Sequence, residues 1–161
     1  MAELNNLISP FFLNNNEIRK VIELFFFSYR DFTTGPDKIL EKINFGRAHH
    51  RIIYFVGKKN NITIKELLKV LQITKQSLSR VLNQLVKNGF IVVSTGKDKR
   101  TKILSLTNKG DILEKELSTI QINKIKKVLK HFNEDDINCF KKILFEMIEL
   151  DNKKTFQQLN E

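Results

Sequence analysis

Apolar residues recur at helical spacing near the start of the chain. They occupy positions i, i+3, i+4 and i+7 over the set Ile18, Val21, Ile22, Phe25, Tyr29 and Phe32. This spacing predicts an amphipathic α-helix, and the asparagines at positions 14–16 are good N-cap residues. Phe26 and Phe27 widen its apolar surface. The stretch Thr33-Thr34-Gly35-Pro36 predicts the end of the helix, because glycine and proline interrupt helices.

Two further helices are predicted at the other end of the chain. Thr107 is a suitable N-cap for a long helix to about Phe132, with a stripe of Leu113, Leu117, Ile120, Val128 and Phe132 and with Ile125 beside it. Residues 133–136 predict a break and an acidic helix start, since carboxylates are favourable at helix N-termini. The last helix carries Ile137, Phe140, Leu144, Met147 and Ile148 on one face.

These terminal helices lie far apart in the sequence, and each has an apolar face to bury. We therefore predict that they intertwine with those of a second copy in a helical dimer. The alternative is a monomer in which the terminal helices only cover the central core.

The centre of the chain has the pattern of a helix-turn-helix. A helix is predicted from Arg47 to Lys59, and Asn60-Asn61 interrupts it. Thr63 and Glu66 then form a capping box at the start of a short helix that closes at residues 72–73.

The second helix of this pair is predicted from Lys75 to Lys87. Thr74 is its N-cap, Asn88-Gly89 supplies its C-cap, and its buried face is Leu78, Val81, Leu82 and Leu85, with Val86 as a further candidate. Two helices separated by three or four residues, the second opening with small polar residues, have helix-turn-helix geometry.

After Gly89 the periodicity changes to that of strands. Residues 90–94 are rich in β-branched side chains, residues 95–100 predict a turn, and residues 101–106 alternate polar and apolar. This pattern predicts a β-hairpin, which we call the wing, with a positive rim of Lys97, Lys99, Arg100 and Lys102. Asp98 is expected to pair with a neighbouring Arg or Lys and so fix the loop. The alternative is an ordinary surface hairpin.

Composition narrows the class of protein. The 161 residues are 41% hydrophobic and 29% charged, as in a soluble globular protein of one domain or one two-part protomer. No apolar run of 18 residues predicts a membrane span, and residues 1–6 lack a secretory pattern. The one cysteine, Cys139, excludes a disulfide framework and a Cys-rich zinc site, and it predicts a reducing, cytoplasmic compartment.

The net charge of +10 suggests a polyanionic partner, either nucleic acid or an anionic membrane surface. Its distribution is more informative than its size. Residues 46–110 hold 14 of the 28 Lys and Arg but only two acids, Glu66 and Asp98, which gives +12. The flanks hold the other 14 basic residues against 16 acids, so the excess is confined to the helix-turn-helix and wing.

The polar face of helix 75–87 has the chemistry of base recognition. Opposite its apolar face lie Gln76, Arg80, Asn83 and Lys87, which we call the reading face. Gln and Asn pair bidentately with adenine and Arg with guanine in a major groove, whereas Lys87 is better placed for phosphate. Lys75, Ser77 and Ser79 flank this face and suit phosphate or base contacts. Arg100 is expected in a minor groove. The alternative is a solvated helix face.

The residues now resemble a known family, the MarR-type winged-helix transcription regulators. Residues 73–89 look like its recognition helix and terminating glycine, and residues 97–100 followed by 104–110 are similar to its D-x-R wing and L-T-x-x-G entry to the long helix. The match is detailed from about Phe45 to Glu116 and covers the whole chain in layout. Residues 46–56 look more like a narrower, PetP-like branch. The Lys-rich wing departs from the family, which often has a second Arg there.

The resemblance implies a mainly α fold with a small β-hairpin wing, a winged helix-turn-helix flanked by dimerisation helices. It implies a homodimer on pseudo-palindromic double-stranded DNA, with recognition helices in successive major grooves and wings in flanking minor grooves. It also implies a cleft for a small aromatic or anionic effector, which Tyr29, Arg30, Phe32 and His49 are candidates to line. The alternative, which we favour, is that the Phe-rich first helix serves only as dimer core.

Other constellations carry no chemistry. His49 and His50 are adjacent, so on a helix they point about 100° apart and do not bind one metal together. No metal or other cofactor is expected. Cys139 is expected to be a buried, inert thiol. The sequence has no Gly-rich phosphate loop, zinc-protease motif or nucleophile elbow, and an enzyme is not expected.

We therefore predict three parts: an N-terminal dimerisation helix and connector (1–45), a winged helix-turn-helix DNA-binding domain (46–110) and C-terminal dimerisation helices (111–161). The predicted function is that of a dimeric, sequence-specific transcription regulator with recognition helix 75–87 and wing 94–102, modulated by a ligand or signal. The alternatives are a nonspecific DNA- or membrane-associated protein and a winged-helix protein-interaction module.

Overall fold

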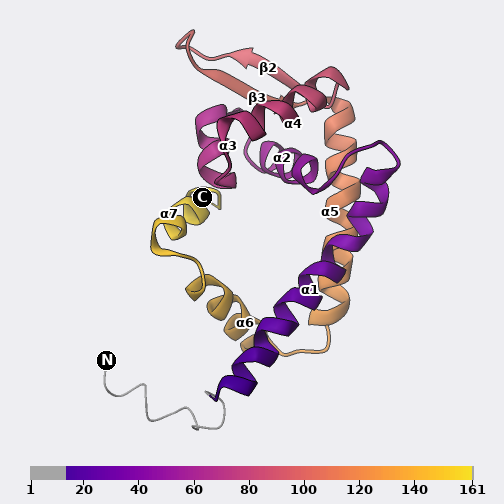
Figure 1. The fold of residues 1–161 in the computed structure, drawn as a ribbon, viewed down its shortest axis with the longest axis vertical. Coiled ribbons are helices and arrows are strands. Elements are labelled where there is room, and N and C mark those ends of the chain that lie inside the picture. The colour runs from indigo at the N-terminus through magenta and orange to yellow at the C-terminus, as the bar shows by residue number, and fades with distance from the viewer. Residues whose placement is uncertain (1–13, 161) are drawn as a thin grey trace.

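The computed structural model describes residues 14–160, which form a winged-helix head on a frame of long helices (Figure 1). Residues 1–13, the first part of the predicted N-terminal region, lie outside the described residues. The elements in chain order are α1 (Asn15–Glu41), α2 (Arg47–Lys58), β1 (Ile62–Thr63), α3 (Ile64–Leu71), α4 (Lys75–Lys87), β2 (Ile91–Thr95), β3 (Lys102–Leu106), α5 (Asn108–Leu129), α6 (Glu134–Glu146) and α7 (Leu150–Gln158). The predicted fold class, mainly α with a β-hairpin wing, is confirmed.

The first helix does not end before Thr33, and that prediction is wrong. Helix α1 continues through Pro36 to Glu41. The hydroxyls of Thr33 and Thr34 donate hydrogen bonds to backbone carbonyls one turn earlier. Pro36 is buried, and α1 packs so closely on α5 that a Cβ on Gly35 would lie 2.6 Å from Ile120 Cγ2. Packing along α5 thus outweighs the helix-breaking tendency of glycine and proline.

The capping box at the start of α3 is confirmed. The N–H of Glu66 donates to Thr63 Oγ1 (3.2 Å), and the Thr63 N–H donates to the Glu66 carboxylate (2.8 Å). Lys59 Nζ donates to the same carboxylate at 2.8 Å. Lys59 and the Thr63 hydrogen bonds lower the pKa of Glu66 to about 2. The cap therefore stays charged, and intact, at any physiological pH.

Helix α4 has the predicted bounds and the predicted buried face. Thr74 Oγ1 accepts the N–H of Ser77, and the four residues predicted for the core are all buried. Val86, the further candidate, is exposed. The chain leaves the helix through Gly89, whose φ of 73° lies in the left-handed region that glycine adopts without strain.

The wing hairpin is the predicted one, with each strand beginning one residue later. Strands β2 and β3 pair antiparallel with Ile91 opposite Leu106. A third strand, β1, was not predicted; it pairs antiparallel with β3, with Ile62 opposite Leu104, and gives the sheet order β1-β3-β2. Two residues are too few for a periodicity signal. The short strand anchors the wing to the helix-turn-helix through the buried side chains of Ile62 and Leu104.

One hydrophobic core joins the head to the long helices. Helices α2 and α4 and the sheet contribute most of it, and Leu40 of α1 and Leu113 and Leu117 of α5 belong to the same cluster. Helix α2 lies at its centre, between α4 and α5 (Figure 1). The position of the recognition helix is therefore fixed relative to both long helices.

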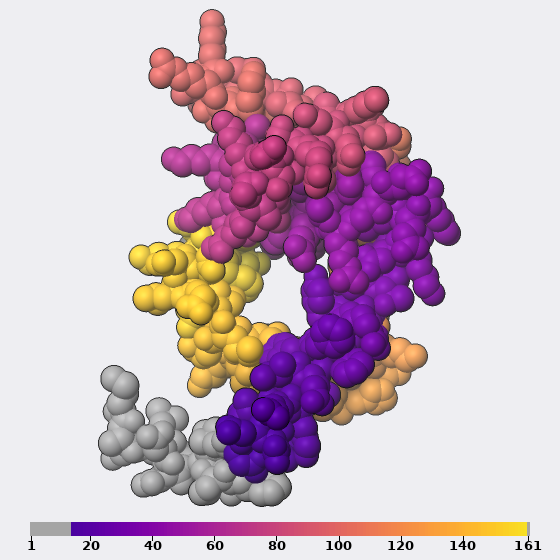
Figure 2. Space-filling view, in the orientation of Figure 1, coloured from indigo at the N-terminus to yellow at the C-terminus, as the bar shows by residue number. Residues whose placement is uncertain are grey.

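The C-terminal part holds one helix more than predicted. Asn133 caps α6 reciprocally with Asp136, which confirms the acidic helix start. Helix α7 then turns back to the head, where Gln72 Nε2 donates to Asn152 Oδ1. Figure 2 shows an open space between these yellow C-terminal helices and the indigo α1. Cys139 is exposed in the single chain, so the prediction of a buried thiol is wrong there.

The L-T-x-x-G stretch has a clear structural basis where α5 begins. Thr107 Oγ1 accepts the N–H of Gly110 (3.1 Å) and donates to Gly89 O (2.7 Å), which ties the start of α5 to the end of α4. A Cβ on Gly110 would lie 2.1 Å from Phe90 O, which is backbone and has little freedom to move. Gly110 is therefore required for this close approach.

We predict that Gly110→Ala lowers the free energy of unfolding by about 1–3 kcal/mol or more, the usual cost of overpacking. The reason is that the added methyl group collides with the Phe90 carbonyl. Urea unfolding followed by circular dichroism measures the change. Gly46→Ala is the matched control, since a Cβ there meets nothing within 4 Å. Equal stability of the two variants would contradict this account of the joint.

Candidate nucleic-acid interface

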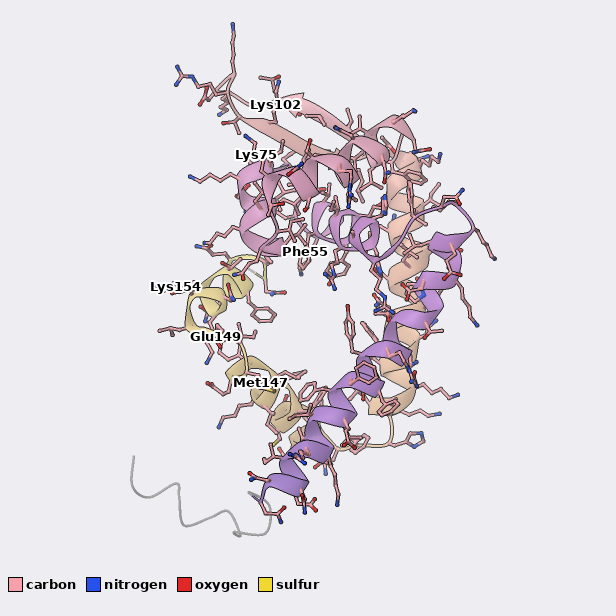
Figure 3. All side chains as sticks on the ribbon, in the orientation of Figure 1. Phe55, Lys75, Lys102, Met147, Glu149 and Lys154 are labelled. Atoms are coloured by element: carbon pink, nitrogen blue, oxygen red, sulfur yellow. The ribbon has the colours of Figure 1, made fainter. Side chains whose placement is uncertain are left out.

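The eleven residues predicted to contact DNA are all exposed and lie on the α4 surface and the wing. Figure 3 places Lys75 at the start of α4 and Lys102 on the wing above it, on the same side of the head. The eleven are Lys75, Gln76, Ser77, Ser79, Arg80, Asn83, Lys87, Lys97, Lys99, Arg100 and Lys102. Each of the eleven is therefore accessible to a partner.

The reading face is exposed because its opposite side is anchored. Leu78, Leu82 and Leu85 face the core, and this leaves Gln76, Arg80 and Asn83 on the outer side of α4. A recognition helix uses such an outer side to meet base edges in a major groove. Arg80 is the residue whose geometry suits guanine.

Asp98 fixes the wing turn by a different contact from the predicted one. Its Oδ1 accepts the backbone N–H of Arg100 (3.0 Å), and its carbonyl accepts the N–H of Thr101 (2.9 Å). The predicted pairing with a basic side chain is therefore wrong. Because short Asp side chains commonly bond the backbone two residues on, the turn is closed without using the Arg100 guanidinium.

Two further lysines, not among the eleven, lie on the helix before α4. Lys65 and Lys69 are exposed and one turn apart on α3, so they share a face. Their signal was present in the charge excess of residues 46–110 but not in any motif. Lys109, by contrast, has a structural contact: Nζ donates to Asn88 O at 2.9 Å and lies 4.3 Å from the Phe90 ring centroid.

A cleft of about 550 Å³ lies between α1, α2 and α5, on the other side of α2 from α4. Of the four effector-site candidates, Tyr29 and Phe32 line it, and Arg30 and His49 do not. Arg30 pairs with Asp31 (2.9 Å) and lies over the ring of Phe27. The complete lining is Tyr29, Phe32, Thr33, Arg47, His50, Arg51, Tyr54, Phe55, Ser118, Gln121, Ile122, Ile125 and Lys126.

The cleft is aromatic and positively charged. Arg47 forms an ion pair with Asp37 at 2.8 Å, whereas Arg51 Nη2 donates to the neutral hydroxyl of Tyr29 at 3.0 Å. Lys126 adds a third cation, and the lining contains no carboxylate within the part of the chain that the structure describes. Burial lowers the pKa of His50, so its ring is neutral at neutral pH.

Residues 14–160 hold neither a metal-binding cluster nor a membrane-spanning helix. No group of three or more His, Cys, Asp or Glu among them is arranged to hold a metal ion. None of their helices is both long and apolar enough to cross a membrane.

The capped helix-turn-helix, the three-stranded sheet and the basic hairpin define a winged helix-turn-helix protein. Residues 43–101 match the MarR family model. The chain is 38% identical over 151 residues to the HTH-type transcriptional regulator PetP of Rhodobacter capsulatus, covering 93% of this chain and 91% of that protein. It is 24% identical over 101 residues to the uncharacterized HTH-type transcriptional regulator YwoH of Bacillus subtilis, covering 63% and 74%. The chain belongs to the MarR family of transcription regulators, whose members are not enzymes.

Solved structures agree on the fold. FabT of Streptococcus pneumoniae, in complex with DNA, superposes with a TM-score of 0.72 at 19% identity, covering 81% of this chain and 94% of that one. A putative MarR family transcriptional regulator from Listeria monocytogenes, complexed with 26mer DNA, gives 0.67 at 22% identity, covering 78% and 84%. The resemblances inferred from the sequence, to the family and to PetP, are confirmed.

Proposed function

We propose that the protein is a dimeric transcription regulator that recognises a pseudo-palindromic operator, with α4 in the major groove and the wing at the minor groove. The main observation in support of this proposal is that the reading face of α4 is exposed while the opposite side of the helix is buried. FabT and the Listeria regulator, which share the fold, were solved with DNA. We expect the protein in the cytoplasm, together with the DNA that it is proposed to bind.

Two kinds of contact contribute to binding: contacts to bases and contacts to phosphates. Gln76, Arg80 and Asn83 discriminate bases, because their donors and acceptors match base edges. Lys97, Lys99 and Lys102 attract phosphates of any sequence, so they set affinity and its dependence on salt. Residues 46–110 form this DNA-binding part.

We predict that Arg80→Ala and Gln76→Ala each cost roughly 1–3 kcal/mol on the preferred operator and relax base preference at their positions. Lys99→Ala should weaken binding to all sequences alike and flatten the salt dependence by about one unit of slope. Gel shifts with the operator selected from a random pool, compared with scrambled duplex across salt concentrations, measure both effects.

An unchanged base preference after Arg80→Ala would show that the reading face is misassigned. Binding of the wild type that is independent of sequence and lost uniformly with salt would indicate a nonspecific DNA-associated protein. No binding even at low salt would favour the protein-interaction module.

The unpacked faces of the terminal helices support the dimer. None of the residues of α6, all of them described, is buried. On α1, Leu24 and Phe26 are each 64% exposed, and Ile143 of α6 and Met147 at its C-cap are more than half exposed. Isolated helices of this length need an apolar partner surface to be stable, and a contiguous exposed apolar surface marks an interface. A second copy supplies the matching surface, so regions 1–45 and 111–161 act as dimerisation regions.

We predict that the protein sediments as a dimer at micromolar concentration and that Phe26→Glu weakens dimerisation by at least about tenfold, since a buried Phe contributes about 1.5–3 kcal/mol. Analytical ultracentrifugation measures the dissociation constant. Val92→Glu is the control, because Val92 is likewise exposed but belongs to strand β2 of the wing rather than to a terminal helix. A monomeric wild type would refute the dimer.

The cleft beside α2 supports control by a small aromatic anion. Its walls come from both dimerisation helices and the DNA-binding part, so a bound molecule touches both. Its volume is in the range of small-molecule sites. Arg51 and Lys126 suit a carboxylate, and Phe32, Tyr54 and Phe55 suit an aromatic ring.

We predict that benzoate binds saturably in isothermal titration and that Arg51→Gln weakens it at least about fivefold, because a charge-assisted hydrogen bond is lost. Arg19→Gln, an exposed change on α1 outside the cleft, should have no effect. Benzamide is the neutral analogue, and equal binding of benzamide would contradict a site for anions.

A further inference from the structure

His49, which was predicted to line the effector cleft, instead uses both of its ring nitrogens in contacts elsewhere. Its Nδ1 accepts the backbone N–H of Gly46 at 3.1 Å, which caps the N-terminus of α2. A neutral ring with Nδ1 as acceptor carries its proton on Nε2. That nitrogen therefore donates to Gln84 Oε1, 2.6 Å away.

The ring of His49 is also held in place from the side. It stacks on Phe45 with centroids 4.3 Å apart and planes 3° from parallel. Phe45 is itself buried and meets Phe90 edge to face at 5.3 Å. Phe90 directly follows the glycine that ends α4. A side chain with two hydrogen bonds and a stacked ring is preorganised, so its contact with Gln84 restricts the partner rather than itself.

Gln84 lies on α4, at the edge of the reading face. It directly follows Asn83 and lies one helical turn after Arg80. The buried leucines of α4 hold the helix against the core through non-directional contacts. A hydrogen bond depends on angle, so the contact with His49 also limits rotation of α4 about its own axis. Rotation is the movement that would carry Arg80 and Asn83 away from their bases.

Helix α2 thus presents two functional sides. Arg47, His50, Arg51 and Tyr54 follow the i, i+3, i+4, i+7 rule and line the cleft, whereas His49 points to α4. The adjacency of His49 and His50, which argued against a metal site, separates the two roles on one rigid helix. If a molecule bound in the cleft moved α2, the His49 ring would move with the helix, and so would its hydrogen bond to Gln84.

We propose that His49 is a positioning residue. It couples helix α2, another side of which lines the cleft, to the orientation of the recognition helix α4. The proposal rests on the proposed function, because it assumes that the reading face of α4 recognises bases. It assigns His49 no contact with DNA or with an effector. It also assigns Gln84 a role in sequence preference without a base contact of its own.

A double-mutant cycle on DNA binding tests the coupling. Gln84→Leu and His49→Ala should each lower affinity for the selected operator about five- to tenfold, as expected for coupled neighbours. The double variant should bind no worse than His49→Ala alone. Affinity for scrambled duplex should change less than about twofold. Gln157→Leu on α7 is the control for a Gln-to-Leu change at an exposed position.

His49→Gln separates positioning from simple folding. A Gln at this third helical position accepts the N-cap N–H as in a capping box, and its amide still has a donor for Gln84. We expect it to restore most of the operator affinity that His49→Ala loses. Thermal unfolding of each variant is measured in parallel, and Gln84→Leu should melt within a few degrees of the wild type while its operator preference falls.

Independent, multiplying losses from Gln84→Leu and His49→Ala would overturn the coupling. So would an equal loss on operator and scrambled duplex, because a positioning role acts on sequence preference alone. Failure of the proposed function is seen separately: a wild type without sequence preference shows it before any variant is compared.

Discussion

The close approach of α5 to the end of α4 is the constraint on which the rest of the structure depends. Gly110 lies against the carbonyl of Phe90, and Thr107 bonds the carbonyl of Gly89. This joint links the recognition helix directly to the long helix that runs to the C-terminal region. A side chain at position 110 would push α5 away from the end of α4. The hydrogen bond from Lys109 to the Asn88 carbonyl would then be broken as well. Thr107 and Gly110 therefore determine how the reading face is placed relative to α5, and so relative to the proposed dimer axis.

Helix α2 is held between this joint and the first helix. It contributes Ile52, Ile53 and Val56 to the core, so it is fixed by packing as well as by its polar contacts. The ion pair between Arg47 and Asp37 ties it to α1. The cleft lies where α1, α2 and α5 meet, so its walls include both helix α2 of the head and the long helices. The proposed effector would therefore contact both parts at once.

Local signals predicted most of the head, and long-range packing decided the rest. Thr63, Thr74 and Thr107 each cap a helix where the sequence placed a cap, because a cap is satisfied within four residues. Pro36 misled because the helix is held by α5, more than eighty residues away in sequence. Helix α7 has only a weak apolar pattern, and it is ordered by Gln72 and Glu146. The histidine that lines the cleft is His50 rather than His49; the helical spacing of the apolar residues Ile52, Ile53 and Val56 places His49 on the core side of α2, a signal that the prediction did not use.

The distribution of charge gains a physical meaning from this arrangement. The wing turn is closed by Asp98, whose carboxylate accepts a backbone N–H, so the basic side chains of the wing stay exposed and are not paired with it. Lysines attract phosphate as point charges and discriminate bases poorly, whereas the arginine and amides of α4 discriminate by geometry. Under the proposed function, therefore, the lysines of the wing contribute affinity and the reading face of α4 contributes preference. Preference of that kind depends on the rotation of α4, and the contacts of Gln84 with His49 and of Asn88 with Lys109 restrict that rotation from the C-terminal half of the helix.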